Sequence, residues 1–280
     1  MPSQSPALWM VATPLGNPGD LSPRAKSVLE SVDIVLAEDT RRAGMMCKRC
    51  GVDVHRFTAC HDHNESDRTA DLIRALKEGK SAAYISDAGT PLMADPGYRL
   101  VRACREAGLQ VSAVPGPCAP VTALSAAGIA PQPFVFFGFL PRDAADIEKT
   151  IQPFAGIGTT LVFFERKDRL KASLALLHSL LGPREAAICR ELTKEHEEFI
   201  LFRLENHADV SDNLLGEITV IIGPPEQAVR SEKDEVRRVL TEEKQRGGKP
   251  RDIARRAQAH LHGWTVKEIY LLMTEEAEPE

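Results

Sequence analysis

The sequence predicts an α/β protein of two domains with a helical extension, and three observations carry this prediction. Strands, loops and helices alternate in the first half of the chain, which implies a parallel sheet covered on both faces. After Gly128 the strands FVFFGF, TLVFFE, AAICRE, FILFRL and ITVIIG follow one another with fewer helices, which suggests some antiparallel pairing. Residues 231–274 look wholly helical. We expect domains at 1–129 and 130–227 and the extension at 228–280.

Four strands alternate with helices in the first domain, and two helix starts are marked by capping residues. Ser22 precedes Pro23, and Asp95 precedes Pro96. Ser and Asp accept hydrogen bonds from free helix N–H groups, and proline suits the first turn. Gly108 ends the helix that Asp95 opens. The expected strands are 7–12, 33–37, 82–86 and 111–114, and the expected helices are 23–31, 66–78, 96–107 and a segment that ends near residue 127.

The extension is expected to hold three helices. A charged helix is followed by the turn GGKPRD, a helix to about His260 and a short last helix. Thr265 with Glu268 three residues later fits a capping box at the start of that last helix. With its basic residues, this arrangement resembles a helix-turn-helix.

Composition limits the classes of protein to which the chain can belong. Of its 280 residues, 43% are hydrophobic and 27% charged, as in globular proteins that fold in water. No apolar run approaches the roughly 18–20 residues of a membrane span, and no signal peptide is evident. The six cysteines fit a reducing cytoplasm better than a disulfide framework. A net charge of −5 argues against wholesale coating of nucleic acid but allows a local basic patch.

Three short loops of small residues lie at the ends of expected strands. They are TPLGN (13–17), SDAGTP (86–91) and PGPCA (115–119), and no glycine-rich phosphate signature occurs in the chain. Glycine lets the backbone approach a ligand closely, and the carboxyl edge of a parallel sheet is where ligands bind. Such loops suit a ligand without phosphates, for example an adenosyl amino acid. The alternative is three ordinary turns.

A longer series of motifs carries a family resemblance across nearly the whole chain. In order, it contains VATPLGN, LAEDTRR, HDHNE, YISDAGTPLMADPGYRLV, VPGPCAPVTALSAAGI, FFGFLP, FFERKDRL, RELTKEHEE and GEITVIIG. These motifs resemble the ribosomal RNA small subunit methyltransferase I family, of the tetrapyrrole-methylase-like class of S-adenosylmethionine enzymes. The resemblance implies a homodimer that holds S-adenosylmethionine between its two α/β domains. It also implies 2′-O-methylation of a cytidine ribose in the decoding region of 16S ribosomal RNA.

The resemblance also assigns residues to the cofactor. Two departures stand out: Cys118 replaces a small hydroxyl residue, and Arg166 replaces a small residue near the expected cleft. The first domain contributes Leu15, Gly16, Asp87, Ala88, Gly89, Thr90, Met93, Cys118 and Ala119. The second domain contributes Phe164, Glu165 and Leu192.

Methyl transfer to a ribose hydroxyl gains from a general base, and several residues are candidates. Asp39 leads, because EDTRR follows a strand and opens on the same edge as SDAGTP. Arg41 and Arg42 are expected to hold RNA phosphate there. The alternative is that Asp39 and Thr40 only cap a helix. The other candidates are Glu38, His61, His63, Glu65, Glu165 and Lys194; for the histidines the alternative is a hydrogen-bonded loop.

The cysteines raise the question of a metal. Cys47 and Cys50 form a single C-x-x-C, and Cys60, His61 and His63 follow. Such a set is able to bind zinc, but one C-x-x-C is weak evidence and methyl transfer needs no metal. We expect none.

The basic residues of the extension have two interpretations. They serve as an arm that contacts RNA phosphates, or they form a solvated face that packs on the partner subunit. The first interpretation assigns RNA contacts to Lys249, Arg251, Arg255 and Arg256.

Two other functions compete with RNA methylation. The first is methylation of a small tetrapyrrole by the same fold, a reaction that has no need for a basic extension. The second is a non-catalytic RNA-binding or assembly protein, which would not bind S-adenosylmethionine.

Overall fold

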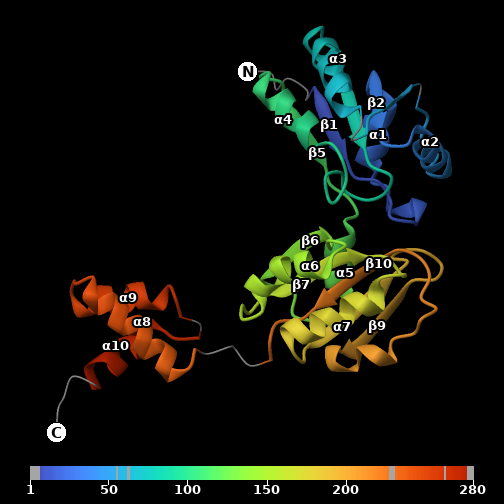
Figure 1. Ribbon diagram of the computed structural model, residues 1–280. Helices are drawn as coiled ribbons and strands as arrows, with labels where there is room; N and C mark the ends of the chain where they lie inside the picture. Colours follow the sequence, from blue (N-terminus) through green and yellow to red (C-terminus); the bar gives the residue numbers. More distant parts are fainter. Residues whose placement is uncertain (1–6, 55, 62–63, 227–230, 262, 276–280) are drawn as a thin grey trace.

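The computed structural model describes residues 7–54, 56–61, 64–226, 231–261 and 263–275, in two sheet domains and a helical unit (Figure 1). The first sheet is wholly parallel, with the strand order β3-β2-β4-β1-β5. This arrangement confirms the predicted parallel sheet and adds one strand, β3. The strands are β1 (Leu8–Val11), β2 (Ile34–Ala37), β3 (Phe57–Ala59), β4 (Ala82–Ile85) and β5 (Val111–Val114).

Helices cover both faces of this sheet, as the sequence predicts. Alternate residues of β4 show why: Ala83 and Ile85 pack toward α1 and α2, whereas Ala82 and Tyr84 pack toward α3 and α4. All four side chains are fully buried. The helices are α1 (Pro23–Ser31), α2 (Thr40–Arg49), α3 (Glu65–Lys77) and α4 (Tyr98–Glu106), and a short 3₁₀ segment, η1 (Pro18–Asp20), precedes α1.

The predicted start of α4 is wrong. Asp95 does not cap the helix, because Gly97 intervenes with a left-handed φ of 119° and the helix begins at Tyr98. The carboxylate that caps it comes from α3, where Glu65 accepts a hydrogen bond from the Leu100 N–H at 3.0 Å. The predicted Ser22 cap is confirmed, since its Oγ accepts from the Ala25 N–H at 3.0 Å.

The second sheet is mixed, with the order β6-β7-β10-β8-β9. β6 pairs with β7 in parallel and all other neighbours are antiparallel, which confirms the predicted antiparallel pairing. α6 and α7 cover one face, and α5, which follows β5, covers the other. The elements are α5 (Ala119–Ala126), β6 (Phe134–Phe139), α6 (Ala144–Ile151), η2 (Gln152–Phe154), β7 (Thr160–Glu165), α7 (Leu170–Leu181), β8 (Glu185–Arg190), β9 (Glu198–Arg203), η3 (Leu204–Asp209) and β10 (Ile218–Ile222).

Three helices form the C-terminal unit: α8 (Lys233–Gln245), α9 (Pro250–Gln258) and α10 (Val266–Glu275). They share an apolar core of their own and lie apart from the two sheets in Figure 1. The predicted capping box is confirmed, because the Thr265 N–H donates to Glu268 at 2.8 Å and the Glu268 N–H donates to Thr265 Oγ1 at 3.2 Å. Trp264 is buried in this core and donates to the Ser231 carbonyl at 2.7 Å. Trp9, in β1, is half-buried beneath the guanidinium of Arg24.

Across the described ranges, none of the helices combines the length and the apolar character needed to cross a membrane.

Candidate functional site

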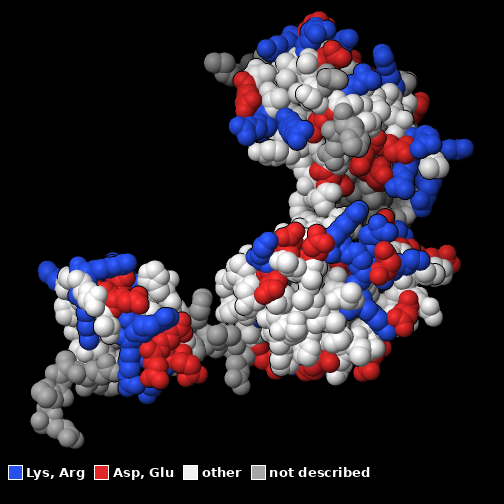
Figure 2. Space-filling model, viewed as in Figure 1, with Lys and Arg blue, Asp and Glu red and all other residues white. Residues whose placement is uncertain are grey.

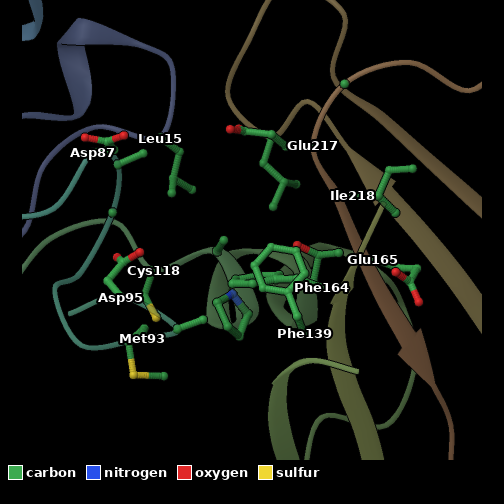
Figure 3. Close-up of a pocket in the computed structure, with 18 of the residues that line it drawn as sticks. Leu15, Asp87, Met93, Asp95, Cys118, Phe139, Phe164, Glu165, Glu217 and Ile218 are labelled. Atoms are coloured by element: carbon green, nitrogen blue, oxygen red, sulfur yellow. The ribbon is translucent and has the colours of Figure 1, made fainter. Parts of the chain in front are cut away.

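A cavity of about 470 Å³ lies between the two sheet domains (Figure 3). Its volume is within the range of about 300–1,000 Å³ that small-molecule sites occupy. The first domain contributes Leu15, Asp87, Ala88, Gly89, Thr90, Met93, Ala94 and Asp95, followed by Cys118, Ala119 and Pro120. The second contributes Phe139, Phe164, Glu165, Arg166, Lys167, Asp168, Leu192, Gly216, Glu217, Ile218 and Thr219.

The cavity gathers all but one of the residues that the sequence assigns to the cofactor. The exception is Gly16, which lies at a contact between the domains instead. A Cβ at Gly16 would overlap Lys194 Cγ, so only glycine admits this lysine. The adjacent Asn17 N–H donates to Thr193 Oγ1 at 3.2 Å. Gly16 therefore lies where the two domains meet, and its lack of a side chain leaves room for Lys194.

Hydrogen bonds tie together the three loops of the first wall. Thr13 and Gly89 exchange two backbone bonds, of 2.9 and 3.1 Å, which join the loops after β1 and β4. Thr90 Oγ1 donates to the Pro117 carbonyl at 2.8 Å, which joins the loops after β4 and β5. Gly89 has a φ of 77°, and a Cβ there would lie 2.9 Å from Leu15 Cδ2. These bonds join the three loops into one wall of the cavity.

Two segments of strained backbone, one from each domain, contribute to the lining of the cavity. In the first domain, Leu92 and Ala94 both have a φ of 71° and flank Met93. In the second, Glu191 and Thr193 have φ of 51° and 64° and flank Leu192. Non-glycine residues rarely adopt this left-handed conformation, and such strain is concentrated at functional sites. In each segment the flanked residue lines the cavity.

Apolar side chains form much of the second wall. Phe164 packs edge to face with Phe136 and Phe139, with ring centroids 5.0 and 5.5 Å apart. The start of β10 joins this wall because β10 is antiparallel to β7, so that Ile218 pairs with Glu165 at the end of β7. Phe139 and residues 216–219 were not predicted from the sequence. Residues 216–219 reach this wall through the direction of β10, which is not evident from a single apolar run.

The carboxylates of the cavity differ in their partners. Asp87 pairs with Arg42 at 2.8 Å. Glu165 accepts from Ser173 Oγ at 2.5 Å and from the Arg166 N–H at 2.8 Å, and Arg169 lies 3.5 Å from it. Figure 3 shows its carboxylate turned away from the wall that holds Asp87. These interactions hold Glu165 as a structural carboxylate, which argues against its candidacy as a free base.

Asp95 lines the cavity, although the sequence predicts it only as a helix cap. Burial first, and then the nearby carboxylates of Glu38 and Asp87, raise the pKa of Asp95 to about 6, while a hydrogen bond with Ser86 opposes the shift. The signal in the sequence was Gly97, which separates Asp95 from the helix.

Asp39, the leading candidate for the general base, caps a helix instead. It accepts from the N–H groups of Arg41 and Arg42, and its carboxylate pairs with the Arg41 side chain at 3.1 Å. The hydrogen bond from that side chain lowers the pKa of Asp39 to about 2. Asp39 and Glu38 are not among the residues that line the cavity. The alternative of a capping role therefore describes Asp39 better than the catalytic one.

The remaining candidates for the base have structural roles or fall outside the described residues. Glu65 caps α4, as described above. Lys194 Nζ lies 2.9 Å from both Glu191 and Glu217 and so ties the strained segment to the loop before β10. His61 belongs to the loop before α3, where its N–H donates to Asn64 Oδ1 at 2.8 Å. His63 lies outside the described residues. Among those described, no group of three His, Cys, Asp or Glu side chains is placed to hold a metal.

The residues predicted to contact RNA fall into two classes. Lys249, Arg251 and Arg255 are exposed on the helical unit, where Figure 2 shows basic side chains beside an acidic cluster. Arg256, in contrast, is bound to the buried Glu243 at 2.6 Å and to the Gly247 carbonyl at 2.8 Å. Its charge stabilises the unit. Arg41 and Arg42 are likewise paired, with Asp39 and Asp87.

Comparison with known proteins places this fold and cavity in a family. The tetrapyrrole (corrin/porphyrin) methylases match residues 7–208. The ribosomal RNA small subunit methyltransferase I of Mesorhizobium japonicum is 44% identical over 239 residues, which are 84% of this chain and 81% of that protein. Its counterpart in Micromonospora olivasterospora is 38% identical over 274 residues, 95% and 87% of the two chains.

A solved structure shares the fold at much lower identity. Uroporphyrin-III C-methyltransferase from Thermus thermophilus, complexed with S-adenosylhomocysteine, aligns with a TM-score of 0.53 at 20% identity. The alignment covers 77% of this chain and 96% of that one. From the identities and the coverage together, the chain belongs to the ribosomal RNA small subunit methyltransferase I family, within the tetrapyrrole methylases.

Proposed function

We propose that this protein transfers a methyl group from S-adenosylmethionine to the 2′-hydroxyl of a cytidine in the decoding region of 16S ribosomal RNA. Methyl transfer and the cofactor follow from the family. The cytidine and its 2′-hydroxyl rest on the resemblance of the motifs. We further propose that the protein works as a homodimer in the cytoplasm, for which the resemblance is again the support.

The observation that carries the proposal is the cavity between the two domains. Its first wall consists of braced loops at the carboxyl ends of parallel strands, and the loops 13–17, 86–91 and 115–119 contain no Lys or Arg. Gly89 lets backbone groups approach a ligand where a Cβ would intrude. Such a wall suits a ligand that carries no phosphate.

The charges of the cavity also fit this cofactor. Five carboxylates line it against two basic side chains, Arg166 and Lys167. A surplus of acids favours a cationic ligand, and the sulfonium and ammonium groups of S-adenosylmethionine are cationic. When bound, S-adenosylmethionine supplies an electrophilic methyl group. Phe139, Phe164 and Leu192 exclude water from that region, and the strained segments hold their lining residues in place before the ligand arrives.

For the RNA, the proposal assigns the exposed cations of the helical unit to the phosphates. Lys249, Arg251 and Arg255 have no ion-pair partner among the residues the structure describes, and the unit lies apart from the cavity. A basic surface away from the reacting centre suits a long polyanion better than a small tetrapyrrole.

The test uses purified protein with methyl-labelled S-adenosylmethionine and either 30S subunits or naked 16S RNA from cells that lack the protein. We expect one new cytidine that resists alkaline hydrolysis on its 3′ side, as 2′-O-methylation requires. Label on a base, or on a porphyrinogen offered in the same assay but not on RNA, would contradict the proposal. Sedimentation of the same preparation tests the homodimer.

A further inference from the structure

A groove of about 880 Å³ adjoins the cavity on the second domain. It lies between the segment 140–144, which follows β6, and the first half of α7. Phe139, Arg166 and Asp168 line both the groove and the cavity, so these three residues mark the junction of the two. The groove therefore gives a ligand that is larger than the cofactor a place beside the cavity.

The charge of the lining reverses between the cavity and the groove. Five carboxylates and two basic side chains line the cavity, whereas three arginines and one carboxylate, Asp168, line the groove. Arg169 lies 3.5 Å from the buried Glu165, and Arg166 pairs with Asp168 at 3.1 Å. The side chains of the second pair are both more than half exposed, so water weakens their attraction. The cavity thus favours a cation, and the groove favours a polyanion.

Arg142 is the arginine of the groove that is left for a ligand. Its side chain is exposed in the segment after β6, and no carboxylate of the described residues forms an ion pair with it. Together with the weakly paired Arg166, it provides two guanidinium groups in the groove. Each of these planar groups is able to bind a phosphate through two parallel hydrogen bonds.

A bulge in β6 sets the position of the aromatic ring at the junction. Phe136 pairs with Val162, and Phe139 pairs with Phe164, so two residues of β6 lie opposite one residue of β7. One of these two residues is Gly138, which has a left-handed φ of 69°. Bulges of this kind redirect a side chain and are frequent next to active sites.

The bulge decides which face of the sheet carries Phe139. Regular alternation after Phe137 would place residue 139 on the face that α6 and α7 cover, where Phe137 packs. The extra residue places the ring beside Phe164 instead, with centroids 5.5 Å apart (Figure 3). Phe139 remains 57% exposed there, so part of an aromatic ring is open where the cavity meets the groove.

We propose that this junction binds the target nucleotide of the RNA, with its base stacked on Phe139 and the adjacent phosphates bound by Arg142 and Arg166. The inference rests on the proposed function. Unpaired bases stack on aromatic side chains whatever their sequence, and guanidinium groups hold the phosphates beside them. The ribose lies between the base and the phosphates, so this binding brings its 2′-hydroxyl to the mouth of the cavity.

The first test measures kcat/KM for RNA at saturating S-adenosylmethionine. Phe139→Ala should lower it by about 5–150-fold, which is the cost of losing one base stack. Phe139→Tyr keeps an aromatic face and should stay within about threefold of the wild type. Phe134→Ala is the matched control, because Phe134 lies at the other end of β6, is 40% exposed and lines neither the cavity nor the groove. It should keep the wild-type value.

An RNA without the target base separates stacking from a structural role of the ring. Once the methylated cytidine has been mapped, 16S RNA is ligated with an abasic ribonucleotide at that position, which keeps the 2′-hydroxyl. The wild type and Phe139→Ala should methylate this RNA with equal kcat/KM, because the stack is absent from both. Affinity for S-adenosylhomocysteine, measured by titration calorimetry, should differ by less than about twofold between the two proteins.

The arginines are tested through the salt dependence of RNA binding. The double variant Arg142→Ala with Arg166→Ala should lower the salt slope in filter binding by about 1.4, since each lost contact with single-stranded RNA removes about 0.7. Lys149→Ala is the matched control, because Lys149 is an exposed cation of α6 that does not line the groove. It should leave the slope unchanged.

The outcomes that overturn the inference differ from those that overturn the function. Phe139→Ala at the wild-type kcat/KM, an equal loss with intact and abasic RNA, or an unchanged salt slope in the arginine double variant would each overturn this subsite. A fall in S-adenosylhomocysteine affinity as large as the fall in kcat/KM would assign the ring to the cofactor and overturn it too. A wild type that methylates no RNA would remove the proposed function, and with it the inference.

Discussion

The two walls of the cavity differ in whether mainly backbone or mainly side chains form their surface. In the first domain, backbone and small side chains face the cavity from loops held together by the Thr13–Gly89 and Thr90–Pro117 bonds. In the second, large apolar side chains face it from the ends of strands, with Phe164 packed on Phe139. A wall made of backbone is sensitive to added bulk, whereas a wall made of side chains is sensitive to truncation. The walls should therefore fail under opposite kinds of substitution.

The carboxylates of the two walls also differ, in whether a basic side chain pairs with them. In the second wall, Glu165, Asp168 and Glu217 are each neutralised by a basic side chain. In the first wall, Asp87 is neutralised by Arg42, but Asp95 is left in an acidic, half-buried place. The second wall thus gives shape, and the first combines shape with a group that titrates near neutral pH.

Among the substitutions that test the two walls, Gly89→Val should have the largest effect on cofactor affinity. Its Cβ would press on Leu15, and its φ of 77° is strained for valine, so we expect cofactor binding to weaken by about 2–3 kcal/mol, or about 30–150-fold. Calorimetric titration with S-adenosylmethionine measures this. Gly108→Val is a matched control, because Gly108 has a φ of 74° but open space around it; it should lose stability and keep affinity. A folded Gly89→Val variant with normal affinity would remove this loop from the site.

Asp95→Asn should stabilise the protein at pH 8. A carboxyl whose pKa is raised from 3.8 to about 6 binds its proton more tightly in the folded state, so this group lowers the free energy of unfolding as pH rises from about 4 to about 6. Asparagine removes the penalty, and we expect a gain of about 1–2 kcal/mol at pH 8 and almost none at pH 4 in urea unfolding.

Glu165→Gln provides the counterpart in the second wall, since it removes the charge that pairs with Arg169. It should lower stability at pH 8. Equal signs for Asp95→Asn and Glu165→Gln would contradict the distinction between free and paired acids.

Phe164→Ala should test the side-chain wall. The truncation removes the edge-to-face contacts with Phe136 and Phe139 and opens the cavity, so affinity should fall by about 1–1.5 kcal/mol, or about tenfold. Phe154→Ala is matched, because Phe154 also packs edge to face, on Phe137, but does not line the cavity. If both variants bound the cofactor equally well, the second wall would not contact it.

The double variant Arg251→Ala with Arg255→Ala should leave both walls unchanged and act on RNA alone. Each lost phosphate contact removes about 0.7 from the salt slope on single-stranded RNA, so the slope should fall by about 1.4. Filter binding over a range of salt concentrations measures it. Arg256→Ala is the contrast: because Arg256 pairs with Glu243, it should lower the melting temperature of the helical unit. An unchanged slope in the double variant would favour packing on a partner subunit.

The sequence predicted the loops better than it predicted the acids. Small-residue loops such as 86–91 carry their signal in residue type and in their place after a strand, so the residues that line the first wall could be chosen without coordinates. Asp39 and Asp95 show the limit. Both precede helices, and a capping aspartate and a cavity aspartate look alike in one dimension. In the structure, the left-handed conformation of Gly97 separates Asp95 from the start of α4, whereas Asp39 directly precedes α2 and caps it.

Contacts between residues that are far apart in the sequence could not be predicted either. Glu65 caps a helix that begins 33 residues later, and residues 216–219 reach the cavity only because β10 runs antiparallel to β7. The two sheets and the C-terminal helices could be predicted from the order and composition of the expected strands and helices. The packing of α5 on the second sheet rather than the first could not, because a short apolar helix carries no mark of the sheet it covers.

The placement of the two tryptophans, the full complement of the chain, gives each end of the molecule its own spectroscopic reporter. Trp9 sits in the first sheet beneath a guanidinium, and Trp264 is enclosed in the helical unit. The second sheet contributes no indole signal. An emission melt is thus the sum of two local transitions, and Trp9→Phe would leave a protein whose fluorescence follows the extension alone, while circular dichroism follows the whole chain.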